Sequence, residues 1–176
     1  MSQSQSQALG RAGHEAIPVG RPLERVLAAI TATDASRAQI LLRGGLALVL
    51  FPHGAQKALG WFGGLGFEGT MAYLTGPIGA PWILAFLAIV VEFVGPALLV
   101  LGLLGRVVAF GVANVMVVAV VTSHLTHGFF MDWGGTMAGE GYEYHLLVIA
   151  LAGALLIGGS GALSVDRRIA GRLQRS

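Results

Sequence analysis

Long apolar segments, separated by short polar ones, dominate the chain from about residue 38 onward. Each approaches the roughly 20 helical residues needed to cross a hydrocarbon core of about 30 Å. The last segment reaches this length only with its polar first residues, because its purely apolar part, residues 146–157, is too short to span. The pattern predicts four transmembrane helices, at residues 38–59, 81–104, 106–124 and 142–161.

Short connections join these predicted helices, so helices that are neighbours in the sequence run antiparallel. We therefore predict an all-α membrane protein, an up-down four-transmembrane-helix bundle over residues 37–165. Glycines are frequent in the spans and let membrane helices approach closely. The glycine clusters at residues 63–66 and 158–161 neither follow a strand nor open a soluble helix, so we interpret them as turns at the membrane boundary. The S-V-D-R-R segment after the second cluster looks like the point where the last membrane span stops.

The pattern is different before the bundle. Residues 1–20 lack the apolar core of a signal peptide, and their Gln and Ser content predicts a disordered tail. In residues 21–36, the side chains of Leu23, Val26 and Leu27 fall on one face at helical spacing. We interpret this segment as a short amphipathic helix in the membrane interface, with a juxtamembrane linker as the alternative.

The composition agrees with a lipid environment. The 176 residues are 55% hydrophobic and 11% charged, with a mean hydropathy of +0.73, whereas an ordinary soluble domain carries about 25% charged residues. So few charges do not cover a surface that faces water. The chain has no cysteine, which excludes disulfides, thiolate ligands and thiol nucleophiles within it.

Basic residues are distributed unevenly among the connections. All of the 11 Lys and Arg residues except Arg43 and Lys57 lie before the first span, between the second and third spans, or after the fourth. The connections at residues 60–80 and 125–141 contain none. By the positive-inside rule both termini are cytoplasmic, and residues 166–176 form a basic cytoplasmic tail. We therefore expect a multi-pass protein of the bacterial inner (plasma) membrane.

Aromatic residues mark the opposite boundary of the predicted bundle. Tryptophan and tyrosine side chains are typical of the membrane–water interface, where one end of the ring meets lipid and the other meets water. We predict an aromatic belt formed by Trp61, Trp82, Trp133, Tyr142 and Tyr144.

Ionisable side chains inside the spans are the candidates for function. Because such groups are costly in hydrocarbon, by default they face the bundle interior and have partners. In the first span, Arg43, His53 and Lys57 lie in one narrow stripe. Between them, Pro52 frees a backbone carbonyl one turn earlier. We interpret the stripe as one wall of an internal polar cavity, with extension of Lys57 and Arg43 to the nearest interface as the alternative.

Glu92 lies near the middle of the second span, and its side chain is too short to reach either interface. The carboxyl group must be protonated, paired with a cation or exposed to water. From its depth we predict that the long side chain of Arg43 is its partner. A structural ion pair and a role in proton transfer or ligand binding both stay open.

Histidines gather in the outer half of the predicted bundle. His124 and His127 lie three residues apart, and together with His145 they offer a weak alternative site for a metal or haem. No H-E-x-x-H or paired Glu-x-x-His motif supports that site, so we expect no metal. Histidines that are simply hydrogen-bonded near the interface and a site for a proton-coupled organic substrate both stay open. Nucleic-acid binding has no support beyond an Arg-rich tail, which the topology explains.

Several motifs, in order along residues 40–169, resemble the DoxX family of small four-helix membrane proteins. The first is R-x-x-L-A-x-x-L-F-x-H-G-x-x-K, from Arg43 to Lys57. The second is E-x-x-G-P-x-L-L-x-L-G-L-x-x-R, which begins at Glu92. A third span that contains Asn and Met and ends at His124 follows, and then Y-E-x-x-L-L and the segment G-x-G-x-L-S-x-D at Gly159–Asp166.

The resemblance implies membrane redox chemistry. A related subunit belongs to a thiosulfate:quinone oxidoreductase, and other members are associated with quinone detoxification or thiol-oxidative stress. By position, the resemblance implies a functional polar set of Arg43, His53, Lys57, Glu92, His124 and Glu143. We expect proton transfer in a quinone pocket from His53, Lys57, Glu92 and His124, and binding roles for Arg43, Glu143 and Asn114.

These expectations combine into a quinone-linked redox subunit. A quinone is the expected ligand, and haem or metal is the weaker alternative. Redox chemistry needs an electron source that this chain does not supply, so we expect a partner subunit or a second copy of the chain in the bilayer. The alternatives are a non-enzymatic membrane module that stabilises a partner complex, and a small transporter or a haem- or metal-binding protein.

Overall fold

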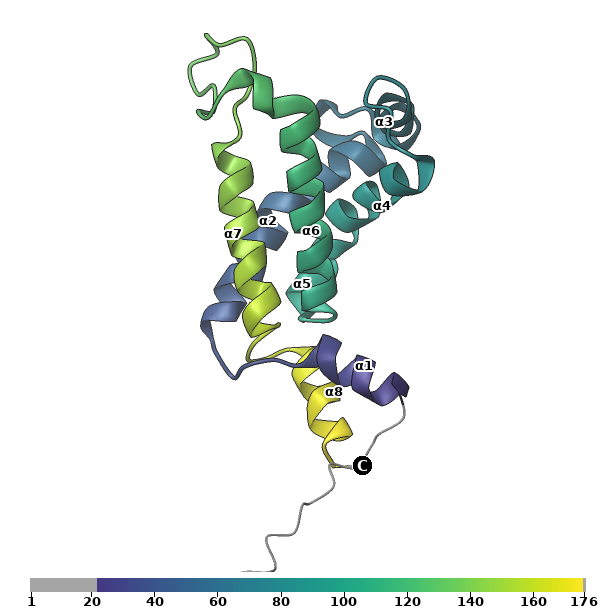
Figure 1. The fold of residues 1–176 in the computed structure, drawn as a ribbon, viewed down its shortest axis with the longest axis vertical. Helices are drawn as coiled ribbons and strands as arrows, with labels where there is room; N and C mark the ends of the chain where they lie inside the picture. The colour runs from purple at the N-terminus through teal and green to yellow at the C-terminus, as the bar shows by residue number, and fades with distance from the viewer. Residues whose placement is uncertain (1–21, 176) are drawn as a thin grey trace, which may run out of the picture.

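The computed structural model of the chain describes residues 22–175, and this part of the chain contains helices and turns but no strand (Figure 1). The prediction of an all-helical protein is confirmed for these residues, while the predicted disordered tail lies outside them. The helices are α1 (Pro22–Thr31), α2 (Ala38–Leu59), α3 (Gly66–Thr75), α4 (Trp82–Phe93), α5 (Gly95–Leu101), α6 (Gly105–Ala119), α7 (Glu143–Gly158) and α8 (Val165–Leu173). Three short turns of helix connect them: η1 (Trp61–Gly63), η2 (Val120–His124) and η3 (Leu125–His127).

Helices α2, α4, α5, α6 and α7 pack side by side and form the body of the molecule. Helices α1 and α8 pack on each other at one end of this body, whereas α3 and the loop between α6 and α7 lie at the opposite end (Figure 1). The two ends thus carry different chemistry, because all four arginines of the C-terminal segment lie at the end formed by α1 and α8.

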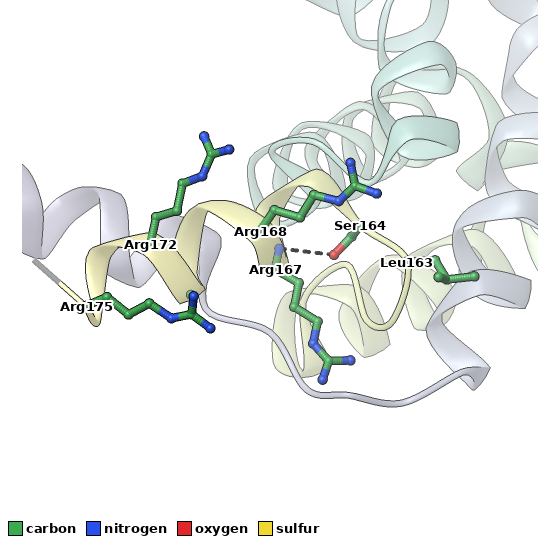
Figure 2. Close-up of a pocket in the computed structure, with 7 residues that line it drawn as sticks. Leu163, Ser164, Arg167, Arg168, Arg172 and Arg175 are labelled. Carbon is green, nitrogen blue, oxygen red and sulfur yellow. Dashed lines mark hydrogen bonds between the residues drawn. The ribbon is translucent and has the colours of Figure 1, made fainter.

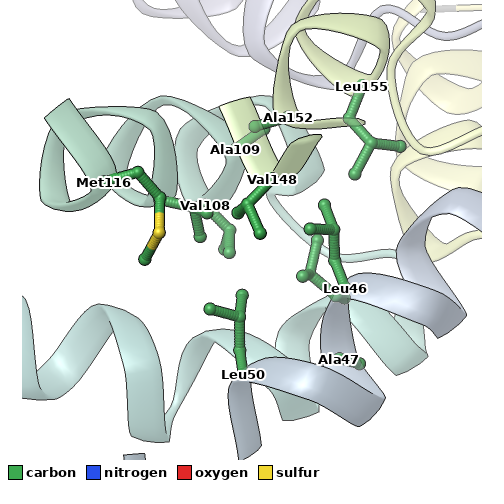
Figure 3. Close-up of a cluster of buried hydrophobic side chains, with 11 residues drawn as sticks. Leu46, Ala47, Leu50, Val108, Ala109, Met116, Val148, Ala152 and Leu155 are labelled. Atoms are coloured by element: carbon green, nitrogen blue, oxygen red, sulfur yellow. The ribbon is translucent and has the colours of Figure 1, made fainter. Parts of the chain in front are cut away.

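The core of the body is one cluster of apolar side chains from α2, α5, α6 and α7 (Figure 3). Its members recur every three or four residues, the spacing that places side chains on one face of a helix. Close packing of such side chains holds helices together even where lipid replaces water outside. The buried set includes Leu46 and Leu50 of α2, Leu99 of α5, Val108, Val112 and Met116 of α6, and Val148, Ala152 and Leu155 of α7.

The outer surface of the same helices is also apolar. Leu41 and Leu48 on α2, and Phe110 on α6, are each between 63% and 78% exposed. Helices that are apolar on the outside as well as on the inside suit a lipid environment, not water. The surface therefore supports the same conclusion as the composition.

Two predicted spans are long and apolar enough to cross a membrane on their own. They are α2, with 22 residues, and the helix that runs from Gly105 through η2 and η3 to His127, with 23 residues. Helices α4 and α5 pass the same test only together, as one span bent by 41°. Helix α7 is apolar but has 16 residues, fewer than the predicted 142–161, because its C-terminal end at Gly158 leads into a glycine turn.

The bend between α4 and α5 was not predicted, and it has a local cause. Pro96 has no N–H to donate to the carbonyl of Glu92 four residues earlier, and its ring crowds that carbonyl. The chain also contains Gly95, which weakens the helix at the same place. The freed Glu92 carbonyl faces α2 at Gly54, where an added methyl group would clash with it. This bend therefore sets the place where the backbones of α2 and α4 come closest.

Two helices lie where connections or tails were expected. Helix α3 lies within the predicted 60–80 connection, and its buried Met71 packs against Ile89 of α4. Helix α8 replaces the predicted stop after Ser164, whose hydroxyl accepts a hydrogen bond from the backbone of Arg167 and so caps the helix. Neither helix carries a long apolar run, so a search for membrane spans misses both.

Candidate functional site

Glu92 and Lys57 form an ion pair between α4 and α2. The Glu92 side chain is 4% exposed and that of Lys57 is 31% exposed, so the pair lies at the edge of the interior. The prediction that Glu92 has a cationic partner is confirmed, but the predicted partner, Arg43, is wrong. Glu92 meets α2 at Gly54, and Arg43 lies 11 residues before that position, roughly 16 Å along the helix. Lys57 lies one turn from Gly54 and reaches the carboxylate.

Arg43 has a structural role at the other end of α2. Its Nη2 donates hydrogen bonds to the backbone carbonyls of Ala162 and Leu163, at 3.2 and 3.0 Å. Its side chain also fills the space beside Gly102, where a methyl group would clash with the guanidinium. Buried Arg43 thus ties α2 to the turn between α7 and α8 and lies apart from Glu92.

Asp166 joins this structural network and was not recognised from the sequence. Its carboxylate accepts hydrogen bonds from the backbone N–H groups of Leu104 and Gly105, at 2.8 and 3.0 Å, and from the hydroxyl of Ser160, at 2.6 Å. These N–H groups belong to the start of α6, where a helix has donors without intrahelical partners and favours a negative charge. The S-x-D end of the last family motif therefore caps α6. An acidic residue between a glycine turn and a run of arginines is the signal that would have found it.

His53 lies on α2 close to the ion pair, and its side chain is exposed. It interacts electrostatically with both Lys57 and Glu92, and its ring centroid lies 6.1 Å from that of Tyr144 on α7. The predicted place of Tyr144 in the outer aromatic belt is wrong, because its hydroxyl oxygen is buried and has no hydrogen-bond partner among the described residues. The phenol instead contributes a free polar atom next to His53.

The rings of His124 and His145 are in tilted contact beside Tyr144. Their ring centroids are 4.2 Å apart, and the ring of Tyr144 lies 5.5 Å from that of His145. His145 is buried, and its Nδ1 atom has no partner among the described residues. The Nδ1 atom of His124 lies 2.8 Å from the carbonyl oxygen of Glu140, to which it donates when it carries the proton. His124 ends a π-helical turn, a distortion that often marks functional sites.

We call these residues the polar cluster. It joins four elements, α2, α4, η2 and α7, and contains four predicted site residues as well as two that were not assigned this role: His53, Lys57, Glu92, His124, Tyr144 and His145.

Three other predicted residues lie outside the polar cluster. Asn114 is on the exposed face of α6 and donates to the carbonyl of Phe110, at 2.7 Å. Glu143 faces the loop before α7, where it accepts a hydrogen bond from the indole of Trp133. The Nδ1 atom of His127 lies 3.0 Å from the carbonyl oxygen of Ser123. Within residues 22–175 no three His, Cys, Asp or Glu side chains are grouped as a metal site requires, so the weak alternative of a metal site gains no support.

The polar cluster gathers several groups that can carry or exchange a proton. It combines an ion pair with two imidazoles that are in ring contact, a third imidazole and a phenol, all within helices that pack in an apolar body. A buried polar atom without a partner costs about 1–3 kcal/mol. Two such atoms, Tyr144 Oη and His145 Nδ1, lie on adjacent residues. Both atoms have hydrogen-bonding capacity that the described residues leave unused.

The fold and the polar cluster together define a helical membrane protein with ionisable groups among its packed helices. The DoxX family model matches residues 38–125, which is half of the chain. The chain belongs to the DoxX family. No curated protein and no solved structure matches it. The matched segment runs from the start of α2 to the first residue of η3 and contains His53, Lys57, Glu92 and His124, whereas α7 lies beyond it.

Proposed function

We propose that the chain is a four-span protein of the bacterial inner membrane with both termini in the cytoplasm. The span formed by α7 is the critical one, because 16 residues give about 24 Å of helix. A bilayer thins locally around a short span at modest cost. The arginines at the end formed by α1 and α8, and the exposed Trp61, Trp82 and Trp133 near the other end, support this orientation.

Within this framework we propose that the polar cluster binds the headgroup of a quinone. The observation that carries this proposal is the pair of buried, unpartnered atoms, Tyr144 Oη and His145 Nδ1. A quinone headgroup has two carbonyl oxygens, each of which needs a hydrogen-bond donor. A phenol and an imidazole with no partner among the described residues meet that need.

Each member of the polar cluster then has a defined role. His53 and His124 hold or release protons near the ligand oxygens, as imidazoles do most readily near neutral pH. Lys57 supplies positive charge, and Glu92 orients the ammonium group through their ion pair. A bound quinone supplies the capacity to accept two electrons and two protons. The electrons come from a partner protein, and Arg43 takes no part because it is held at the far end of α2.

The test is quinone binding by the protein purified in a mild detergent. Tyr144→Phe removes only the unpartnered hydroxyl and retains the ring next to His53. We expect its affinity for a short-chain ubiquinone to fall about tenfold, the equivalent of one hydrogen bond worth about 1.4 kcal/mol. Asn114→Leu is the matched control, because Asn114 lies on the exposed face of α6. Unchanged affinity in Tyr144→Phe and also in His145→Phe would contradict the proposal.

A second candidate function is a non-enzymatic module that stabilises a partner complex. One observation favours it: the loop between α6 and α7 exposes large aromatic side chains, with Trp133 89% exposed and Phe130 66% exposed. Exposed aromatic groups are typical of contact surfaces. If this function is correct, Trp133→Ser releases a stoichiometric partner in a pull-down, while substitutions in the polar cluster change only the abundance of the protein.

A further inference from the structure

The outward face of α8 carries a hollow of about 510 Å³ that is rich in arginine (Figure 2). It lies at the end of the molecule where α7 turns into α8, far from the polar cluster. We call it the arginine hollow, and the residues that line it are Leu163, Ser164, Arg167, Arg168, Gly171, Arg172 and Arg175.

The spacing of the arginines along α8 explains the shape of the hollow. At about 100° per residue, Arg168 and Arg172 lie about 100° and 140° round the helix from Arg167. Gly171 and Arg175 lie between these two rims, and a methyl group added at Gly171 would meet no atom within 4 Å. Figure 2 shows Arg167 on one side of the helix and Arg168 and Arg172 on the other. The glycine therefore forms an open floor between Arg167 on one side and Arg168 and Arg172 on the other.

The charge of this hollow is not neutralised within the described part of the protein. The ion pair found among residues 22–175 joins Lys57 to Glu92 and involves none of the four arginines. The nearest acid in the sequence, Asp166, is 1% exposed and turns inward to cap α6. Like charges such as Arg168 and Arg172, one turn apart on a helix, repel each other. The hollow thus has the charge and the donor groups of an anion site, and arginine binds phosphate through two parallel hydrogen bonds.

We propose that the arginine hollow binds the phosphate of an anionic phospholipid of the cytoplasmic leaflet. The observation that favours a lipid over a free anion is the apolar surface beside the arginines. Leu163, which lines the hollow, is 83% exposed. Such side chains are unfavourable in water but suit contact with acyl chains. A phosphate among the arginines and an acyl chain along Leu163 together match a glycerophospholipid.

The experiment measures lipid binding by the full chain in detergent, using native mass spectrometry with phosphatidylglycerol and with zwitterionic phosphatidylcholine. We expect phosphatidylglycerol to bind more tightly, and the double variant Arg168→Gln/Arg172→Gln to lose about tenfold in affinity for it. The control is Arg25→Gln/Arg37→Gln, which removes the same charge from the same end of the molecule but leaves the hollow intact. Its affinity should change less than about twofold.

A second variant separates a shaped site from diffuse attraction. Gly171→Leu keeps all four arginines and fills the floor of the hollow, and its new side chain points into open space, so α8 should remain folded. We expect it to weaken phosphatidylglycerol binding as strongly as the arginine substitutions do. Equal binding of the two lipids, or wild-type affinity in both hollow variants, would overturn the proposal. Competition by inorganic phosphate or glycerol phosphate at millimolar concentration would assign the site to a soluble anion instead and overturn the lipid assignment.

Discussion

At the scale of single residues, the contact between Gly54 and the backbone at Glu92 determines how the site is built. Gly54 has no side chain, so α4 approaches α2 until the Glu92 carbonyl meets the Gly54 Cα. This approach puts the carboxylate of Glu92 within reach of Lys57, one turn further along α2. One glycine therefore selects the partner of the buried acid.

Gly54→Ala should destabilise the protein by about 1–3 kcal/mol, because the new methyl group meets backbone atoms that have no rotamer to escape into. Gly44→Ala, in the same helix, is the control. A methyl group there meets nothing within 4 Å, and alanine favours a helix more than glycine by about 1 kcal/mol. Thermal unfolding in detergent should give a lower Tm for the first variant and an equal or higher Tm for the second. Equal Tm values would refute the close contact.

The ion pair of Lys57 and Glu92 allows structure and function to be separated at the same scale. Lys57→Met should cost about 3–5 kcal/mol, because it leaves a buried carboxylate without a partner. The double variant Lys57→Met/Glu92→Met removes both charges, and its stability should return to within about 1–2 kcal/mol of the wild type.

Quinone binding distinguishes these two roles of the pair. If the polar cluster is a ligand site, the double variant regains stability but not affinity. It should bind a short-chain ubiquinone more weakly than the wild type does. Wild-type affinity in the double variant would limit the ion pair to a structural role. The comparison needs Tm and affinity from the same preparation.

At the scale of elements, one carboxylate organises the junction of α5, α6 and α8. Asp166 accepts hydrogen bonds from the first N–H groups of α6 and from Ser160. Its own backbone N–H donates to the carbonyl of Gly102, at 3.0 Å. A family motif that reads as a glycine turn followed by a basic tail thus holds α8 to the junction of α5 and α6.

Asp166→Ala should destabilise the protein by about 2–4 kcal/mol, because it leaves three donors unpaired, two of them at a helix N-terminus. Asp166→Asn retains part of the hydrogen bonding and should fall between the alanine variant and the wild type. Glu68→Gln, at an exposed carboxylate of α3, should change Tm little. Scanning fluorimetry in detergent gives the Tm of each variant for this comparison. An alanine variant as stable as Glu68→Gln would show that the cap contributes nothing.

At the scale of the whole molecule, the position of α7 decides the topology. Two helices are long and apolar enough to cross a membrane on their own, and a third span is available as a bent pair. The side on which the C-terminus lies therefore depends on whether the 16-residue α7 also crosses. The chain has no cysteine, which makes single introduced cysteines clean reporters of sidedness.

We expect Met137→Cys, in the loop before α7, to react with a membrane-impermeant maleimide in intact cells. Gln174→Cys, after α8, should react only once the membrane is permeabilised, since four spans place these two positions on opposite sides. Both side chains are exposed in the structure, so access to the reagent depends only on the side of the membrane. Labelling of both positions in intact cells would show that α7 does not cross.

The sequence alone determined those features that depend on the solvent around each segment. Apolar runs predicted an all-helical membrane protein and the bounds of α2 at residues 38 and 59, because lipid requires continuous helices with apolar side chains. The same reasoning identified His53, Lys57, Glu92 and His124, since ionisable groups are rare in such segments. It missed α3 and α8, which have no long apolar run.

Only the tertiary structure decided which of these residues meet. Depth along a straight span suggested Arg43 as the partner of Glu92, but a bend after Glu92 and a missing side chain at Gly54 brought Lys57 there instead. Tyr144 belongs to the polar cluster because α7 turns its phenol inward. The position of an aromatic residue near the end of a span does not reveal that direction. Contacts between helices depend on rotation, bending and close approach, and hydrophobic periodicity specifies none of these closely enough to pair two side chains.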